Sequence, residues 1–189
     1  MRVFRADELR RFLAAVDANL TERVAMLILG GGALALYGVD AGTSDIDTWE
    51  TDLSRLQEAM ARARAQTGLN VPVSQAAVAD TPYHCQDRLW RVFPEFQRLD
   101  VFTLEIHDLA LSKAVRGYEN DLAGIEALHR IHPLDLVTLV GRYVDEMGHV
   151  IGGRSRLDRN LLLMIERLFG EIEADRTREE LRRRRRSPT

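Results

Sequence analysis

The sequence has almost none of the features that crosslink a chain or carry it through a membrane. One cysteine, Cys85, is present among 189 residues, which excludes an internal disulfide and gives no indication of an oxidising compartment. No apolar run approaches the roughly 18 residues that a membrane-spanning helix needs. Charged residues are scattered through positions 1–20, where a signal peptide would be apolar. We therefore expect a cytoplasmic protein that has no contact with a membrane.

Lysine is also nearly absent. Lys113 is the single lysine among the 26 Lys and Arg residues, and the formal net charge is −3. A chain with this balance has no general electrostatic preference for nucleic acid. Lysine is a compact point charge on a flexible stem, whereas arginine presents a wide planar fork. The retention of lysine at this one position favours a functional role for Lys113, and a solvated surface side chain is the simpler alternative.

Hydrophobic periodicity predicts an α+β protein, because strands and helices alternate up to about residue 105 and only helices follow. The expected strands are 23–31, 43–51, 70–79 and 98–106, and the expected helices are 7–20, 31–38, 52–66, 107–117, 119–130, 134–148 and 155–181. Residues 80–97 read as a loop with a short helical turn, and Pro133 as the first turn of the next helix. We expect a small mixed sheet flanked by helices over 1–128, and a helical region over 129–189 that ends in a solvated basic tail, Arg182–Arg186.

Two aspartates are separated by one residue in the segment TSDID. On a strand, residues i and i+2 point to the same face, so the carboxylates of Asp45 and Asp47 project together. Two neighbouring anions repel each other unless a cation lies between them. Mg²⁺, or Mn²⁺ in its place, takes oxygen ligands and shares its coordination shell with substrate phosphates. We therefore expect a metal site at Asp45 and Asp47, with the hydroxyls of Thr43 and Ser44 nearby.

Three glycines, Gly30–Gly32, follow the first expected strand and open a short helix. Glycine lets a backbone approach a ligand closely, and the start of a helix presents free N–H groups to a phosphate. Gly31, Gly32 and Ser44 are therefore candidates for nucleotide binding. Either motif alone is weak, since a triple-glycine turn and a pair of spaced aspartates are both common. Together, in the order strand, glycines, helix, strand, they indicate a site for a nucleoside triphosphate and its metal.

Two other nucleotide-binding motifs fit the segment poorly. A dinucleotide-binding fingerprint would require Gly30, Gly32 and Ala35 to serve as its three small residues, and no acidic residue stands in the ribose-binding place about twenty residues further on. A P-loop is excluded, because no Gly-Lys-Ser or Gly-Lys-Thr follows the glycines.

The segments GGGALALYG and TSDID resemble the signature of the DNA polymerase β-like nucleotidyltransferase superfamily. The segment HDLALSKAVRGYENDLAGIEAL is similar to the later motifs of abortive-infection toxin nucleotidyltransferases of the AbiEii type, with matches at Asp108, Lys113, Arg116 and Asp121. The resemblance covers about residues 24–128. It implies that the glycines and the aspartate pair hold nucleotide and metal, that Lys113 and Arg116 contact the triphosphate, and that Asp121 holds one of them in place.

A third carboxylate is usual in that superfamily, on a later strand. The expected third strand contains no acidic residue in its interior. Asp100, in the fourth expected strand, is our candidate for the third metal ligand, and Asp80 is the second choice. If neither serves, the protein binds a nucleotide without efficient transfer.

The resemblance implies an enzyme that moves a nucleoside monophosphate from an NTP to a hydroxyl. Asp45, Asp47, Asp100 and Lys113 would be catalytic, and the acceptor would be an RNA end (tRNA among them), a protein or a small molecule. It further implies a toxin of a toxin–antitoxin or phage-defence system with a cognate antitoxin. The alternative is a catalytically idle nucleotidyltransferase fold that acts as an antitoxin-like partner protein.

Overall fold

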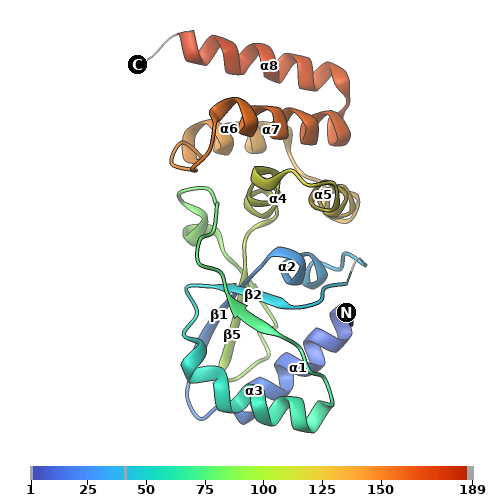
Figure 1. Ribbon diagram of the computed structural model, residues 1–189, viewed down its shortest axis with the longest axis vertical. Helices are drawn as coiled ribbons and strands as arrows, with labels where there is room; N and C mark the ends of the chain where they lie inside the picture. The colour runs from blue at the N-terminus through green and yellow to red at the C-terminus, as the bar shows by residue number, and fades with distance from the viewer. Residues whose placement is uncertain (1, 41, 187–189) are drawn as a thin grey trace. The chain divides into compact units, whose positions relative to one another are not determined.

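The computed structural model describes residues 2–40 and 42–186, and its chain divides into two compact units. The first unit comprises residues 1–79 and 88–105, and the second comprises residues 80–87 and 106–189 (Figure 1). A five-stranded mixed sheet with flanking helices occupies the first unit, and the described part of the second is helical. The expected α+β class is confirmed. The division lies before residue 106, whereas we expected it after residue 128.

The sheet of the first unit has the order β3-β2-β1-β5-β4. Its strands are β1 (Val24–Leu29), β2 (Ile46–Trp49), β3 (Val73–Gln75), β4 (Trp90–Val92) and β5 (Leu99–Thr103). Strand β1 pairs antiparallel with β2 and parallel with β5, β3 runs parallel to β2, and β4 antiparallel to β5. The short edge strand β4 falls inside the segment that we expected to be a loop. Its helical turn is confirmed as the 3₁₀ helix η1 (Cys85–Arg88).

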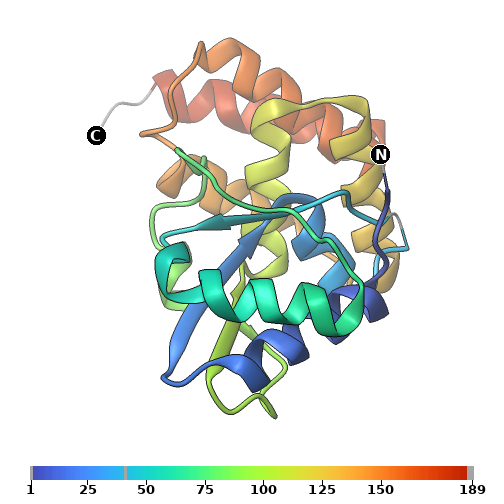
Figure 2. The same ribbon diagram turned by 60° about the horizontal axis from the view of Figure 1, so that its bottom comes forward.

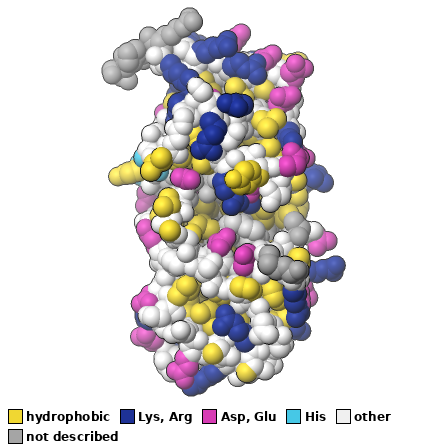
Figure 3. Space-filling model, viewed as in Figure 1, with side chains coloured by type: hydrophobic (Ala, Val, Ile, Leu, Met, Phe, Trp, Pro, Cys, Tyr) yellow, Lys and Arg dark blue, Asp and Glu magenta, His cyan; other side chains and the backbone are white. Residues whose placement is uncertain are grey.

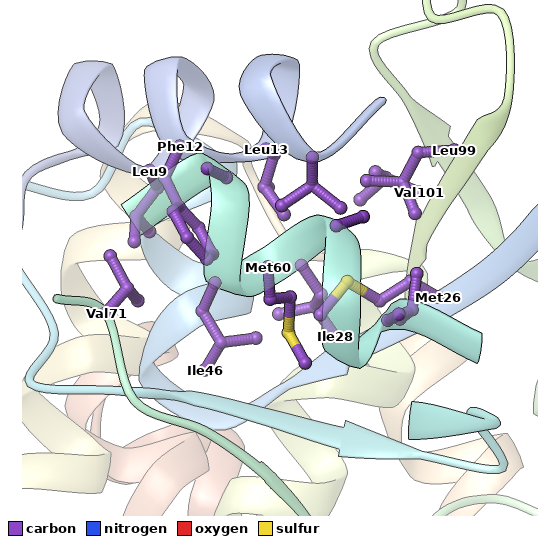
Figure 4. Packing of buried hydrophobic residues seen from close by; sticks show 14 of the residues in the cluster. Leu9, Phe12, Leu13, Met26, Ile28, Ile46, Met60, Val71, Leu99 and Val101 are labelled. Carbon is purple, nitrogen blue, oxygen red and sulfur yellow. The ribbon is translucent and has the colours of Figure 1, made fainter. Parts of the chain in front are cut away.

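Helices α1 (Ala6–Asn19) and α3 (Leu53–Thr67) pack side by side over one face of this sheet (Figure 2). Figure 4 shows the core between them, where side chains from α1 and Met60 of α3 meet alternate residues of β1 and β5. Asp52 caps α3 by accepting a hydrogen bond from the Ser54 N–H, and Gly68 ends it in the left-handed conformation with φ +69°. These two ends are where the sequence predicts them.

Asp17, at the end of α1, ties that helix to the start of β5. Its carboxylate accepts hydrogen bonds from the backbone N–H groups of Gln97, Arg98 and Leu99, at 3.2, 2.6 and 2.7 Å. Burial acts to raise the pKa of Asp17, but these N–H donors outweigh it and hold the pKa below its ordinary value. This carboxylate therefore fixes α1 to the end of the sheet at which β1 and β5 begin.

The second unit contains the helices α4 (Ile106–Arg116), α5 (Glu119–Ile131), α6 (Leu136–Glu146), α7 (Arg154–Phe169) and α8 (Glu171–Arg186). They share one apolar core, to which Leu111, Leu139 and Ile165 each contribute a side chain that is 1% exposed or less. Helix α6 begins after its N-cap Asp135, so Pro133 precedes the helix rather than lying in its first turn. No described helix is long and apolar enough to cross a membrane.

The C-terminal segment differs from the expectation in two respects. One helix over 155–181 was expected, but Gly170, with φ +91°, separates α7 from α8. The arginine run does not form a loose tail, because Arg182–Arg186 continue α8. Positively charged residues at the C-terminal end of a helix interact favourably with the helix dipole.

Candidate functional site

Asp45 and Asp47 lie at the start of β2. Asp47 is the second residue of the strand, and Asp45 lies in the bend that precedes it, so the strand begins three residues later than expected. Both side chains are half-buried, whereas Ile46 between them is fully buried in the core. The pairing places Asp47 opposite Leu29, the last residue of β1. Asp47 therefore lies where β1 ends and α2 (Gly30–Leu36) begins.

The carboxylate of Asp47 is held from two sides. Its Oδ1 accepts a hydrogen bond of 3.1 Å from the Ser74 hydroxyl, which belongs to the neighbouring strand β3. Its Oδ2 lies 3.2 Å from the position that a Cβ atom on residue 30 would take. Gly30 also has φ +63°, a conformation that other residues rarely adopt. Glycine at position 30 therefore lets the Asp47 carboxylate approach the first turn of α2.

The other two glycines serve close packing of the same turn. A Cβ atom on Gly31 would lie 2.8 Å from the Thr43 hydroxyl, and one on Gly32 would lie 3.0 Å from the Ile28 side chain. The Thr43 hydroxyl in turn donates to the Asp45 carbonyl at 2.9 Å. The glycines thus bring the first turn of α2 against the segment that carries the two aspartates. That their N–H groups bind phosphate stays a prediction, as does a role for Ser44, which lies half-buried in the bend beside Asp45.

Asp100 is not brought to Asp47. Both residues lie on the same face of the sheet, but Asp100 pairs with Ala25, four residues before Leu29 along β1. Four residues of a strand correspond to about 13 Å. The Asp100 carboxylate instead forms ion pairs with Arg91 and, at 3.8 Å, with Arg23. The geometry therefore gives no support to Asp100 as a metal ligand beside Asp47.

Lys113, Arg116 and Asp121 form a buried cluster in the second unit. The Asp121 Oδ1 accepts a hydrogen bond of 2.9 Å from the Lys113 ammonium and one of 2.6 Å from Arg116. The side chains of Asp121 and Lys113 are 1% and 7% exposed, whereas that of Arg116 is 54% exposed. The Asp121 Oδ2 is buried and has no hydrogen-bond partner among the described residues. Lys113 is therefore not a solvated surface lysine.

Two further acids of the expected motifs also belong to the second unit. Asp108 is fully buried in α4 and accepts a hydrogen bond of 2.8 Å from Arg142 of α6. This ion pair joins two helices of the unit, which is a structural role. Asp80 is half-buried at the start of the segment 80–87.

The chain matches one known protein family over most of its length. A family model described as a nucleotidyltransferase of unknown function, DUF6036, matches residues 7–170. The chain belongs to this nucleotidyltransferase family. No curated protein and no solved structure matches it. The family match includes the glycines, both aspartates and Lys113, and it leaves the narrower likeness to AbiEii-type toxins as a prediction.

Ser74 is the residue of this DUF6036 site that sequence reasoning missed. It lies in an expected strand, but a serine in a strand carries no signal of its own. Only the register, which pairs Ser74 with Asp47, reveals that its hydroxyl meets the carboxylate. Ser74 therefore lies on β3 directly beside the Asp47 carboxylate.

Proposed function

We propose that this chain is a metal-dependent nucleotidyltransferase that moves a nucleoside monophosphate from an NTP to a hydroxyl acceptor. One observation carries the proposal: the half-buried Asp47 carboxylate is held by Ser74 against the first turn of α2, in a chain of the DUF6036 family. Glycine at position 30 suits that approach, because its φ is +63° and a Cβ atom there would lie only 3.2 Å from the Asp47 Oδ2.

The donor atoms at this place fit a hard divalent cation. Asp45 and Asp47 offer carboxylate oxygens. No group of three or more His, Cys, Asp or Glu residues that could hold a metal occurs among residues 2–40 and 42–186, so these two aspartates would be the carboxylate ligands of the ion. Mg²⁺ is commonly held by one or two carboxylates and completes its shell with water and substrate phosphates. Such an ion, or Mn²⁺, supplies charge stabilisation at the phosphate oxygens.

Each residue then has a specific task. Asp47 and Asp45 hold the cation, and Ser74 fixes the orientation of the Asp47 carboxylate. The N–H groups of Gly31 and Gly32 bind phosphate oxygens, with the Ser44 hydroxyl beside them. The acceptor oxygen forms a bond to the α-phosphorus, the bond from that phosphorus to the β-phosphate oxygen breaks, pyrophosphate leaves, and the acceptor proton passes to solvent.

Lys113 and Arg116 extend this proposal through the resemblance to AbiEii-type toxins. They would neutralise charge on the triphosphate, and Asp121 would position them. Their hydrogen bonds to Asp121 support the second part, since one carboxylate holds both cations. The acceptor would be an RNA end such as that of tRNA, a protein or a small molecule.

The decisive experiment compares the protein with Asp47→Asn and with Asp40→Asn, in which an exposed aspartate of the preceding loop is changed. Each variant is incubated with Mg²⁺, each labelled NTP, total RNA and protein extract, and Mn²⁺ binding is measured by electron paramagnetic resonance. A metal contribution of several kcal/mol predicts that Asp47→Asn lowers transfer on the order of 100-fold or more. It should also weaken Mn²⁺ binding, while Asp40→Asn changes neither. Equal transfer by all three proteins would refute the proposal.

The second candidate is a catalytically idle protein that binds a nucleotide and acts on a partner. The observation that favours it is the place of Asp100, which is paired with Arg91 away from Asp47. Among the described residues, no third carboxylate joins Asp45 and Asp47 in a group that could hold a metal. This candidate predicts a melting shift with NTP and Mg²⁺ but no labelled product.

A toxin role is the cellular form of the first candidate. Expression of the protein in a bacterium would then stop growth, expression of Asp47→Asn would not, and a cognate antitoxin would relieve the arrest. Growth arrest by both proteins would separate toxicity from nucleotidyl transfer.

A further inference from the structure

The last two helices form an antiparallel hairpin. Gly170 is the single residue between α7 and α8, and Arg185 near the end of α8 donates a hydrogen bond to Asp158 near the start of α7. The first turns of α7 and the last turns of α8 therefore lie side by side. We call this end of the hairpin, residues 154–160 and 180–186, the basic end.

Charge is strongly segregated at the basic end. Its two segments contain eight arginines and only two acidic residues, Asp158 and Glu180, although the whole chain has a net charge of −3. Figure 3 shows Lys and Arg side chains gathered over α8, with acidic side chains grouped separately on the same helix region. The net charge of the sequence does not reveal this positively charged end, because acidic residues elsewhere in the chain offset its charge.

Six of the eight arginines of the basic end form two groups, whereas Arg156 donates a hydrogen bond of 3.3 Å to the Val115 carbonyl. Arg154 and Arg185 face Asp158, and Arg184 forms ion pairs with Glu180 and with Asp145 of α6. These contacts fix α8 on its neighbours.

The second group comprises Arg159, Arg182 and Arg183. All three are exposed and have no ion-pair partner in the part of the chain that the structure describes. Helices α7 and α8 thus present three exposed guanidinium groups that no ion pair among the described residues compensates.

The composition of this surface decides what it fits. Its two large apolar residues, Leu157 and Leu181, are buried at 3% and 6% exposure, and none of the exposed large hydrophobic residues lies in its described part. Membrane-binding helices and protein-interface cores both need exposed apolar side chains beside their charges. A nucleic-acid backbone needs only cations, and Arg is well suited to phosphate.

We propose that the basic end of the α7–α8 hairpin binds the phosphate backbone of a nucleic acid. Binding itself is independent of nucleotidyl transfer. The role of this binding rests on the proposed function: the bound polynucleotide would be the acceptor of the nucleoside monophosphate. The contact is with phosphates rather than with bases, so it is insensitive to sequence and sensitive to salt.

The test compares Arg182→Gln/Arg183→Gln with Arg176→Gln/Arg178→Gln. The second pair removes the same charge from the same helix, but these arginines already face Glu173 and Asp175. Fluorescence anisotropy measures the binding of labelled 20-nucleotide RNA and DNA strands without NTP or metal, from 50 to 200 mM salt. Melting temperatures show that each variant is folded.

Each lost phosphate contact reduces the slope of log K against log salt by about 0.7 for a single strand. Arg182→Gln/Arg183→Gln should therefore reduce the slope by about 1.4 and weaken binding at 50 mM salt by roughly tenfold to a hundredfold. The control pair should change either quantity much less. Equal binding of RNA and DNA would support a contact with the phosphates that both share, and stronger binding of RNA would support the contact and identify RNA as the polynucleotide.

Several outcomes would overturn the inference: no binding of either strand at 50 mM salt, a slope unchanged in Arg182→Gln/Arg183→Gln, or an equal loss in the control pair. Binding to vesicles with anionic lipid in place of both strands would also overturn it. Asp47→Asn keeps the two proposals apart, because it should lower transfer on the order of 100-fold or more and leave nucleic-acid binding intact. Intact binding without transfer by the wild-type chain would refute the enzyme and retain the surface.

Discussion

Removal of the Asp121 carboxylate should destabilise the second unit far more than removal of the neighbouring Arg116. In Asp121→Ala, the Lys113 ammonium stays buried at 7% exposure and loses the carboxylate that lies 2.9 Å away. Breaking a buried ion pair by deleting one partner costs about 3–5 kcal/mol, because the other charge is left uncompensated. Arg116 is half exposed, and in Arg116→Ala the buried Asp121 carboxylate keeps the Lys113 ammonium as its partner, so this substitution should cost only about 1 kcal/mol.

A double variant separates the cost of the orphaned charge from the cost of altered packing. In Lys113→Met/Asp121→Ala no uncompensated buried charge remains, so most of the stability lost in Asp121→Ala should return. The Asp121 Oδ2, which has no hydrogen-bond partner among the described residues, gives a further reason why this carboxylate is dispensable once Lys113 is gone.

Urea unfolding provides the assay, followed by two signals. Trp49 and Trp90, the only two tryptophans of the sequence, lie in the first unit, so their fluorescence reports that unit. Far-UV circular dichroism is weighted towards the helices. A loss below about 1 kcal/mol in Asp121→Ala, or no recovery in the double variant, would refute a buried ion pair. If the double variant is stable but does not transfer nucleotide, Lys113 acts on the substrate as well.

Three further predictions concern the first unit. Gly30→Ala should lower the free energy of unfolding by about 1–2 kcal/mol and weaken Mn²⁺ binding, because it strains the backbone and displaces the Asp47 carboxylate. Gly68→Ala is the control: it strains the backbone in the same way but meets no neighbouring atom, so it should leave Mn²⁺ binding unchanged. Ser74→Ala should weaken Mn²⁺ binding by roughly twofold to tenfold, which corresponds to the loss of one hydrogen bond, and Ser74→Thr should keep the wild-type affinity. Equal Mn²⁺ affinity of the Ser74→Ala and Ser74→Thr proteins would contradict the positioning role. The pKa of Asp17 is lowered in the folded protein, so its contribution to stability is complete above the unfolded pKa of about 3.9 and is lost as the pH falls through the folded pKa. In urea unfolding, wild type should therefore be more stable than Asp17→Asn by about 2 kcal/mol at pH 7, and this difference should shrink by pH 3.

The sequence by itself predicted the features that depend on near neighbours. The two ends of α3, at Asp52 and Gly68, could be predicted because a side-chain cap and a left-handed glycine act within one helical turn. The glycines Gly30–Gly32 and the pair Asp45 and Asp47 mark a strand, helix and strand in the expected order. The family match supports the same nucleotidyltransferase interpretation.

Strand register and the division into units were decided only by the tertiary structure. Asp100 and Ser74 both lie in expected strands, and nothing local distinguishes them, yet pairing places Ser74 beside Asp47 and Asp100 about 13 Å along the sheet. A glycine such as Gly170 is tolerated in a helical pattern at a cost of about 1 kcal/mol, so the sequence allowed either one helix or two.

The surroundings of Lys113 and of the arginine run also depended on how helices pack against one another. Lys113 reads as an isolated cation in the sequence, and only the packing of α4 against α5 buries it with Asp121. The arginine run reads as a solvated tail, and only the α7–α8 hairpin places it beside the arginines at the start of α7. Burial and charge segregation are properties of the folded chain, because they arise where separate helices pack against one another.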